Sequence, residues 1–387
     1  MANKAFVALG IVLAIAGVSL AVLHVVSVGA IVIDEEWVRE YISEVPVDLT
    51  IYHDSIYVLA LSDSTGASLY KISFSGDIAW RNSWSILNES HLTRLIPREA
   101  GISVVIISPS RHEVNVLSYS SYGGLVSNKS LVLSEVVWAF DASSYVDGSI
   151  VIVGTRYSVG RGLELYASRI NLDDNDTYWS ITWGSEGDDV ALKAVITSSG
   201  LIYVVGESLG VGGIVACLDG FGEVLWSRAI NVTDFISVKA LGDDVLILAR
   251  GVDGSYGVIK ASRLGDVGVV DYIKVPEDFT PLDLHVVSSY TALAGYQRSI
   301  GGNASSAAIM LYTNKGLSNV IKLNVPSIFT RIEVFDSTMY SVGVAESRLI
   351  AIAHSIKHSE LNVIQLIAST AVASIGSFIA YREMHRR

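Results

Sequence analysis

Short apolar runs separated by turn-forming residues fill the middle of the chain. The stretch Gly200–Trp226 shows the pattern: a turn at Gly200, an apolar run, a small residue at Gly206, a glycine-rich turn and two further apolar runs. Runs rich in β-branched and aromatic residues between such turns are typical of antiparallel strands. No helical periodicity interrupts them. The middle of the chain is therefore predicted to be all-β.

One apolar run in each unit ends on a position that is usually small, and this position recurs seven times. The spacings between successive positions are 47, 47, 52, 43, 46 and 48 residues. The positions are Ala60, Ile107, Gly154, Gly206, Ala249, Gly295 and Gly343. A turn-forming residue stands six positions before each one, and further apolar runs lie on both sides. Four strands in each unit of about 40–50 residues predict a seven-bladed β-propeller rather than a helical solenoid.

The seventh unit ends after its third strand, so its fourth strand must come from elsewhere. The segment Trp37–Leu49 resembles the passage between strands that begins at Val269. We therefore expect this N-terminal segment to supply the missing strand of the last unit. Such a strand would close the ring and remove an exposed sheet edge.

Two long uncharged segments flank the repeats. Phe6–Ile33 is long enough for about 42 Å of helix, more than the roughly 30 Å of a bilayer core. Leu361–Tyr381 is also uncharged and is followed by arginines, as membrane spans often are. The sequence therefore predicts a plasma-membrane protein with two transmembrane helices and the propeller outside the cell. The predicted order is a cytoplasmic N-terminus 1–5, a signal anchor 6–33, an extracytoplasmic propeller 34–360, a second span 361–381 and a cytoplasmic basic tail 382–387.

Charge and cysteine content exclude several kinds of partner and site. The net charge of −12 gives no general basic surface, so no nucleic-acid partner is predicted. The single cysteine, Cys217, excludes an intrachain disulfide and a zinc site built from several cysteines. Because Cys217 lies inside an apolar run, we expect a buried and unreactive thiol.

Two segments resemble a known family of propeller repeats. Leu218–Trp226 (LDGFGEVLW) and, more weakly, Ser75–Trp80 (SGDIAW) combine an acidic and glycine-containing turn with a tryptophan in the outer strand. In this they resemble the PQQ-like repeats. The resemblance implies a propeller with tryptophans packed between blades. Quinoprotein dehydrogenases of that family generally have eight blades, a calcium-bound quinone and a catalytic aspartate, and none of those residues can be placed here, so no cofactor is predicted.

Few residues are candidates for chemistry. The alternate spacing of Asp173, Asn175 and Thr177 could present oxygen atoms to calcium, but the glycine and distal glutamate of an EF-hand loop are missing. A solvated turn is the favoured interpretation. The histidines show no metal-binding spacing, and no nucleophile or phosphate-binding motif appears in its required context, so no catalytic residue is assigned.

Five Asn-x-Ser/Thr sequons are candidate glycosylation sites. They are Asn88, Asn128, Asn175, Asn231 and Asn303. Each falls at a predicted blade edge or loop, where an attached glycan would be tolerated.

These observations favour a non-enzymatic binding or scaffolding module at the cell surface, with a protein or glycan partner at one propeller face. One alternative is a hydrolase or quinone-dependent dehydrogenase with its site at the axial mouth. Another is an accessory subunit of a larger membrane complex. Carboxylates or histidines clustered at the channel, with shifted pKa values, would favour the enzyme. A mouth lined by serine, tyrosine and glycine would favour binding.

Overall fold

The computed structural model describes residues 31–41, 44–62, 66–85, 92–134, 137–172, 176–270, 273–287, 290–298, 305–346 and 348–358. The chain divides into two compact units, one made of residues 1–34 and 355–387 and the other of Glu35–His354. The second unit contains nearly all of the described residues; strands joined by turns make it up, and its one helical element among these residues is a 3-10 turn at Pro109–Arg111.

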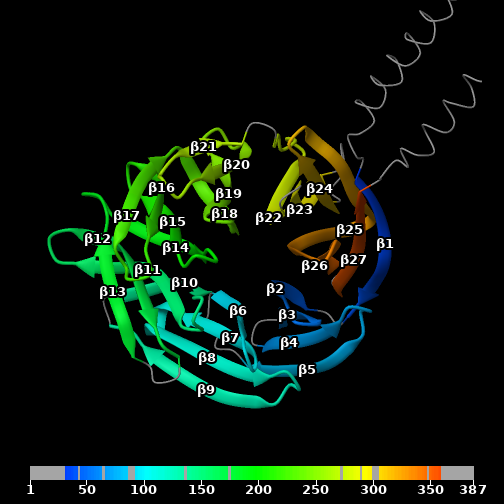
Figure 1. The fold of residues 1–387 in the computed structure, drawn as a ribbon, viewed down its shortest axis with the longest axis horizontal. Coiled ribbons are helices and arrows are strands. Elements are labelled where there is room, and N and C mark those ends of the chain that lie inside the picture. Colours follow the sequence, from blue (N-terminus) through cyan, green and yellow to red (C-terminus); the bar gives the residue numbers. More distant parts are fainter. Residues whose placement is uncertain are drawn as a thin grey trace, which may run out of the picture. The chain divides into compact units, whose positions relative to one another are not determined.

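Five sheets of the second unit contain four antiparallel strands each, in sequence order (Figure 1). The first holds β2 (Val45–Tyr52), β3 (Ser55–Ser62), β4 (Gly66–Ser73) and β5 (Ile78–Ser85). The second holds β6 (Leu92–Arg98), β7 (Gly101–Ser108), β8 (Glu113–Ser120) and β9 (Leu125–Val132). The third holds β10 (Val137–Ser144), β11 (Ile150–Ser158), β12 (Gly162–Ile170) and β13 (Thr177–Trp183). The fourth holds β14 (Asp189–Ile196), β15 (Ile202–Ser208), β16 (Gly212–Leu218) and β17 (Val224–Ile230). The fifth holds β18 (Val232–Leu241), β19 (Asp244–Gly251), β20 (Tyr256–Ala261) and β21 (Val267–Val269).

The remaining strands form one seven-stranded sheet, in the order β1-β27-β26-β25-β24-β23-β22. Its members are β1 (Ile31–Glu40), β22 (Phe279–Val287), β23 (Tyr290–Arg298), β24 (Ser305–Thr313), β25 (Gly316–Phe335), β26 (Thr338–Ala345) and β27 (Arg348–His358). The long strand β25 pairs with β24 as far as Pro326 and with β26 from Ser327 onward. The prediction of seven separate blades is therefore wrong. Five four-stranded blades are present, and the last two predicted units are fused through β25.

The N-terminal segment supplies a strand beside the last one of the chain, as expected, but only part of the predicted segment forms it. β1 lies beside β27 at the edge of the seven-stranded sheet, and the Tyr41 amide donates to the Leu349 carbonyl at 2.7 Å. The predicted closing segment Trp37–Leu49 is divided between β1 and the first strand of the next sheet, β2.

Neighbouring sheets pack face to face through both of their surfaces. In β11, Ile150 and Ile152 join the apolar cluster shared with the preceding sheet, while Val151 and Val153 join the cluster shared with the following sheet. Alternate residues of a strand point to opposite faces, so a strand between two neighbours needs apolar residues at every position. This explains why the second strand of each unit is an unbroken apolar run.

Tryptophans fasten successive sheets together, as the sequence suggested. The indole N–H of Trp179 on β13 donates to the Gly220 carbonyl of the next sheet at 2.9 Å. The ring lies against Gly222, where φ is +86° and a Cβ would stand 2.8 Å from the indole. The same hydrogen bond joins Trp37 to Phe74, Trp80 to Ser121 and Trp226 to Arg263, at 2.7 to 3.0 Å. Trp37 therefore repeats, at the closure, the contact made inside the ring.

The predicted transmembrane helices find no support. Among the residues that the structure describes, no helix is long and apolar enough to cross a membrane. Leu361–Tyr381 and most of Phe6–Ile33 lie outside the described residues, and where Phe6–Ile33 enters them, at Ile31, the chain is a strand. The expectations of two membrane spans, a membrane partner and a plasma-membrane location are therefore corrected and not retained. The cell-surface protein or glycan partner that depended on them is not retained either.

Candidate functional site

The first strands of the units contact one another in a closed circle, β2-β6-β10-β14-β18-β22-β25, around the centre of the ring (Figure 1). Six of these strands contain a β-bulge, and β6 pairs regularly. A bulge places an extra residue in one strand and redirects the side chains that follow it. The residue just after each bulge lines the central cavity.

The recurrent small residues exist because of these bulges. The bulge of β14 brings the Val190 carbonyl so close to Gly206 that a Cβ there would lie 2.1 Å from the oxygen. The equivalent distance at Gly154 is 1.9 Å. Ile107, the exception in the sequence pattern, lies opposite Leu92 of the unbulged β6 and therefore has room for its side chain.

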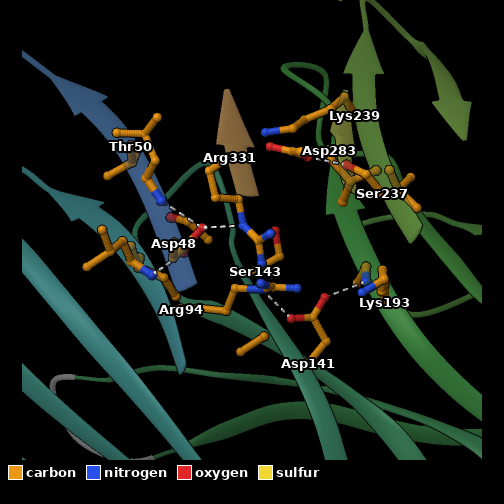
Figure 2. Close-up of a pocket in the computed structure, with 18 of the residues that line it drawn as sticks. Asp48, Thr50, Arg94, Asp141, Ser143, Lys193, Ser237, Lys239, Asp283 and Arg331 are labelled. Carbon is orange, nitrogen blue, oxygen red and sulfur yellow. Dashed lines mark hydrogen bonds and ion pairs between the residues drawn. The ribbon is translucent and has the colours of Figure 1, made fainter. Parts of the chain in front are cut away.

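Two layers of side chains surround the central axis. The first layer consists of Asp48, Arg94, Asp141, Lys193, Ser237, Asp283 and Arg331. Since alternate residues of a strand share a face, a second layer lies two residues further along each strand. It consists of Thr50, Ile96, Ser143, Val195, Lys239, His285 and Glu333. A cavity of about 280 Å³ lies among these layers (Figure 2).

The lining is charged, and its charges balance. Four carboxylates line the cavity: Asp48, Asp141, Asp283 and Glu333. Four cations line it as well: Arg94, Lys193, Lys239 and Arg331. The cavity therefore carries no net charge, and what it can bind depends on which of these groups already have partners.

Each axial aspartate connects its own strand to the next strand of the circle. One oxygen of each carboxylate accepts a backbone N–H from that neighbouring strand, a charge-assisted hydrogen bond. The donors are Leu95 for Asp48 at 2.8 Å, Ala194 for Asp141 at 3.1 Å and Ile332 for Asp283 at 3.1 Å. These three contacts hold the circle of first strands together.

The other oxygen of each aspartate is also engaged. Arg94 Nε lies 2.7 Å from Asp141 Oδ1, and the Ser237 hydroxyl donates to Asp283 Oδ1 at 2.6 Å. At Asp48, Oδ1 accepts the Leu49 amide at 3.1 Å, with Arg331 Nε 3.8 Å away. Burial raises the pKa of Asp48 against the opposing effect of the nearby arginines.

Glu333 is held between two bases of the second layer. Lys239 Nζ lies 2.6 Å from Glu333 Oε1, and His285 Nδ1 lies 2.9 Å from Oε2. Burial disfavours the charged carboxylate, but these two neighbours outweigh it and lower the pKa of Glu333 to about 2. Glu333 is therefore ionised at neutral pH, with a basic side chain close to each of its oxygens.

Lys193 differs from the other cavity cations. Its amino group makes no ion pair and no hydrogen bond within the described part of the chain. Burial and the Arg94 guanidinium lower its pKa, since both disfavour another positive charge there. The hydroxyls of Thr50 and Ser143 likewise have no protein partner among these residues. These three polar groups are available to a ligand.

The candidate sites read from the sequence do not coincide with this cavity. Asp173 and Asn175 lie outside the described residues, and Thr177 is exposed at the start of β13. No group of three or more metal-ligating side chains occurs in the part that the structure describes. The solvated turn favoured for this stretch, and the weaker calcium interpretation, both stay untested.

The glycosylation candidates also remain predictions. Asn128 is exposed on β9, and Asn231 is exposed between β17 and β18. Asn88, Asn175 and Asn303 lie outside the described residues.

The axial residues themselves were missed at the sequence level, although a signal for them exists. Each first-layer residue stands twelve or thirteen positions before the small position of its unit, as Asp48 precedes Ala60 and Lys193 precedes Gly206. At six of the seven positions the residue is charged. The lining is thus a charged cluster and not a surface of serine, tyrosine and glycine, which by the criterion drawn from the sequence favours the enzyme; protein groups, however, already engage the cavity carboxylates.

Comparison with known proteins supports the fold. No protein-family profile matches the chain, and no curated protein sequence matches it. A mutant of puromycin hydrolase complexed with PGG matches at a TM-score of 0.55 and 11% identity, covering 78% of this chain and 50% of the hydrolase. A protein of unknown function from Bacteroides caccae matches at a TM-score of 0.45 and 11% identity. The match covers 73% of this chain and 98% of the Bacteroides protein. A candidate gluconolactonase matches at a TM-score of 0.39 and 12% identity. The match covers 66% of this chain and 85% of the gluconolactonase.

Identities this low show the fold alone. The β-propeller architecture stands, and no family match confirms the resemblance to PQQ-like repeats. This chain spans half the length of the puromycin hydrolase that it matches.

Proposed function

We propose that this β-propeller is a binding module whose central cavity holds a small polar molecule. The observation that carries the proposal is the set of unpartnered polar groups at Lys193, Thr50 and Ser143, in a cavity whose other charges are paired. All three groups are half-buried, so a ligand that fills the cavity would cover them, and a ligand that supplies hydrogen bonds to them would avoid the free-energy cost of burying them unpaired.

The size of the cavity limits the ligand. Small-molecule sites usually enclose about 300–1,000 Å³, and this cavity, at about 280 Å³, lies at the lower end. It is suited to a compact metabolite rather than to a peptide or a glycan chain. Fixed strands supply the lining, so the site is preorganised and binding should need little rearrangement.

A thermal-shift screen tests the proposal. Wild-type protein would be heated with small carboxylates, phosphates, polyols, amides and amines at millimolar concentration. Ser143→Phe places an aromatic ring in the cavity, and Ser227→Phe makes the same change at an exposed position of β17. We expect at least one compound to stabilise the wild type and the Ser227 variant but not the Ser143 variant. No stabilisation by any compound, or stabilisation that survives Ser143→Phe, would refute the proposal.

An enzyme with an axial site is the second candidate, and the lowered pKa of Lys193 favours it. A lowered pKa increases the share of lysine in its neutral form, which can attack a carbonyl carbon and form a Schiff base with loss of water. Incubation with small aldehydes or ketoacids and borohydride would then add the reduced substrate mass at Lys193. Intact-protein mass spectrometry that finds no adduct would exclude this chemistry for the compounds used.

A further inference from the structure

Every carboxylate oxygen of the central cavity already has at least one partner in the protein. At Asp141, Arg94 occupies one oxygen and the Ala194 amide the other. At Asp283, the Ser237 hydroxyl and the Ile332 amide do the same.

The two remaining carboxylates are engaged in the same way. The Leu49 and Leu95 amides contact separate oxygens of Asp48, and Lys239 and His285 contact separate oxygens of Glu333. The cavity therefore offers a cationic ligand no carboxylate oxygen that lacks a protein partner.

The cationic groups are not satisfied to the same extent. Lys193 has three N–H donors and makes no hydrogen bond or ion pair within the described residues. Arg331 Nε is 3.8 Å from its nearest carboxylate oxygen, beyond hydrogen-bond distance. Although formal charges balance, every carboxylate oxygen has a protein partner whereas the Lys193 amino group has none among the described residues. A bound molecule must bring the acceptors, and a negatively charged group is the strongest acceptor.

We propose that the ligand of the central cavity is a short hydroxylated organic anion whose carboxylate or phosphate group is bound by Lys193. This inference rests on the proposed binding function and names its ligand class. The anionic group would lie in the first layer, where Arg94 and Arg331 add positive potential beside Lys193 (Figure 2).

The second layer suggests the hydroxylated body. On the four consecutive strands β2, β6, β10 and β14 it presents Thr50, Ile96, Ser143 and Val195, which alternate between hydroxyl and aliphatic side chains. The two free hydroxyls can donate to and accept from ligand hydroxyls. The aliphatic side chains suit the carbon skeleton between them. Lys239 and Glu333, in the opposite sector, are already paired.

Matched ligands separate anion recognition from general binding. Calorimetric titrations at pH 7 would use lactate with lactamide, glycerate with glycerol, and glycerol phosphate with the same glycerol. Carboxylate and phosphate are thereby tested separately. We expect at least one anion to bind and its neutral counterpart to bind at least tenfold more weakly.

Variants of Lys193 then assign the contact. Lys193→Met removes the charge at nearly constant shape, and we expect it to weaken anion binding about 10- to 100-fold, as loss of a charged hydrogen bond does. Lys193→Arg keeps the charge and should restore part of the affinity. Lys322→Met, at an exposed position of β25 outside the cavity, should leave affinity unchanged. Circular dichroism and thermal midpoints would verify that each variant is folded.

The possible outcomes separate the two proposals. If neutral or cationic compounds bind as well as anions, or if Lys193→Met binds the anion as tightly as wild type, the anion inference is wrong while the binding function stands. If no compound binds wild-type protein, the proposed function itself is wrong.

Discussion

Replacement of Gly206 by alanine should destabilise the propeller, whereas the same replacement at Gly257 should not. Both glycines lie in interior positions of a blade, on β15 and β20, and both have φ outside the left-handed region. They differ in surroundings. A Cβ on Gly206 would stand 2.1 Å from the Val190 carbonyl oxygen, while a Cβ on Gly257 meets no atom within 4 Å.

The size of the destabilisation by Gly206→Ala follows from how far the bulged strand must move to admit the new methyl group. Relief of a 2.1 Å contact to an acceptable 3.0 Å separation requires the bulged strand to move by about 0.9 Å. Overpacking of this kind costs about 1–3 kcal/mol. At Gly257 the alanine restricts the unfolded chain without a clash and should stabilise by about 0.5–1 kcal/mol. Ala60 and Ala249 occupy equivalent small positions, so one methyl group is tolerable when the strand is spaced for it.

Urea unfolding followed by tryptophan fluorescence measures the difference. The two variants should be separated by about 1.5–4 kcal/mol, provided that their denaturant slopes agree. The movement of β14 would also displace Lys193, so Gly206→Ala should weaken ligand binding in the cavity more than Gly257→Ala does. If Gly206→Ala has a midpoint equal to or above that of Gly257→Ala, the small positions are not there to admit the bulge.

Three further changes test other contacts. Asp141→Ala should lower the free energy of unfolding by about 1.5–3 kcal/mol, because it leaves the half-buried Arg94 guanidinium without its 2.7 Å partner, whereas removal of an exposed aspartate should cost at most about 1 kcal/mol. Trp179→Phe removes the hydrogen bond to Gly220 and should cost about 1–2 kcal/mol in the same urea assay. His354 is buried, and burial lowers its pKa from 6.5 to about 4. The unfolded chain therefore binds a proton first as the pH falls, so stability should decline from pH 6.5 toward pH 4, by about 2–3 kcal/mol at pH 4.5. His354→Leu should abolish that part of the decline, and an unchanged pH profile would contradict the assignment.

Strand positions were predictable because local chemistry sets them. Turn residues such as Gly200 adopt positive φ, and the apolar run that follows is buried on both faces between neighbouring sheets. Neither property depends on knowing the rest of the chain. The tryptophan of the outer strand was equally readable, and Trp37 marks the closing strand by the same hydrogen bond that Trp179 makes inside the ring.

The fusion of the last two units was not predictable from periodicity. The spacing of the repeats predicts a unit boundary between Lys322 and Phe335, where the structure has the continuous strand β25. This passage from Lys322 to Phe335 contains no glycine, and Pro326 restricts φ to a value compatible with extended backbone. The chain therefore stays extended across the boundary and pairs with β24 and β26 in turn.

The Lys193 amino group lacks a carboxylate partner among the described residues because the circle contains an odd number of first strands. Acidic and basic residues alternate around the circle, and Arg331 and Arg94 each face an aspartate on the next strand. Seven positions cannot alternate without a break, and the break falls at Ser237, on the strand after Lys193. Lys193 therefore faces the Ser237 hydroxyl, which already donates its hydrogen bond to Asp283. That next strand has no carboxylate in the first layer to pair with Lys193. The order of charges is present in the sequence at a constant distance from the small positions, but only the closed circle makes the first and last of them neighbours. The unpaired lysine is thus a consequence of closure.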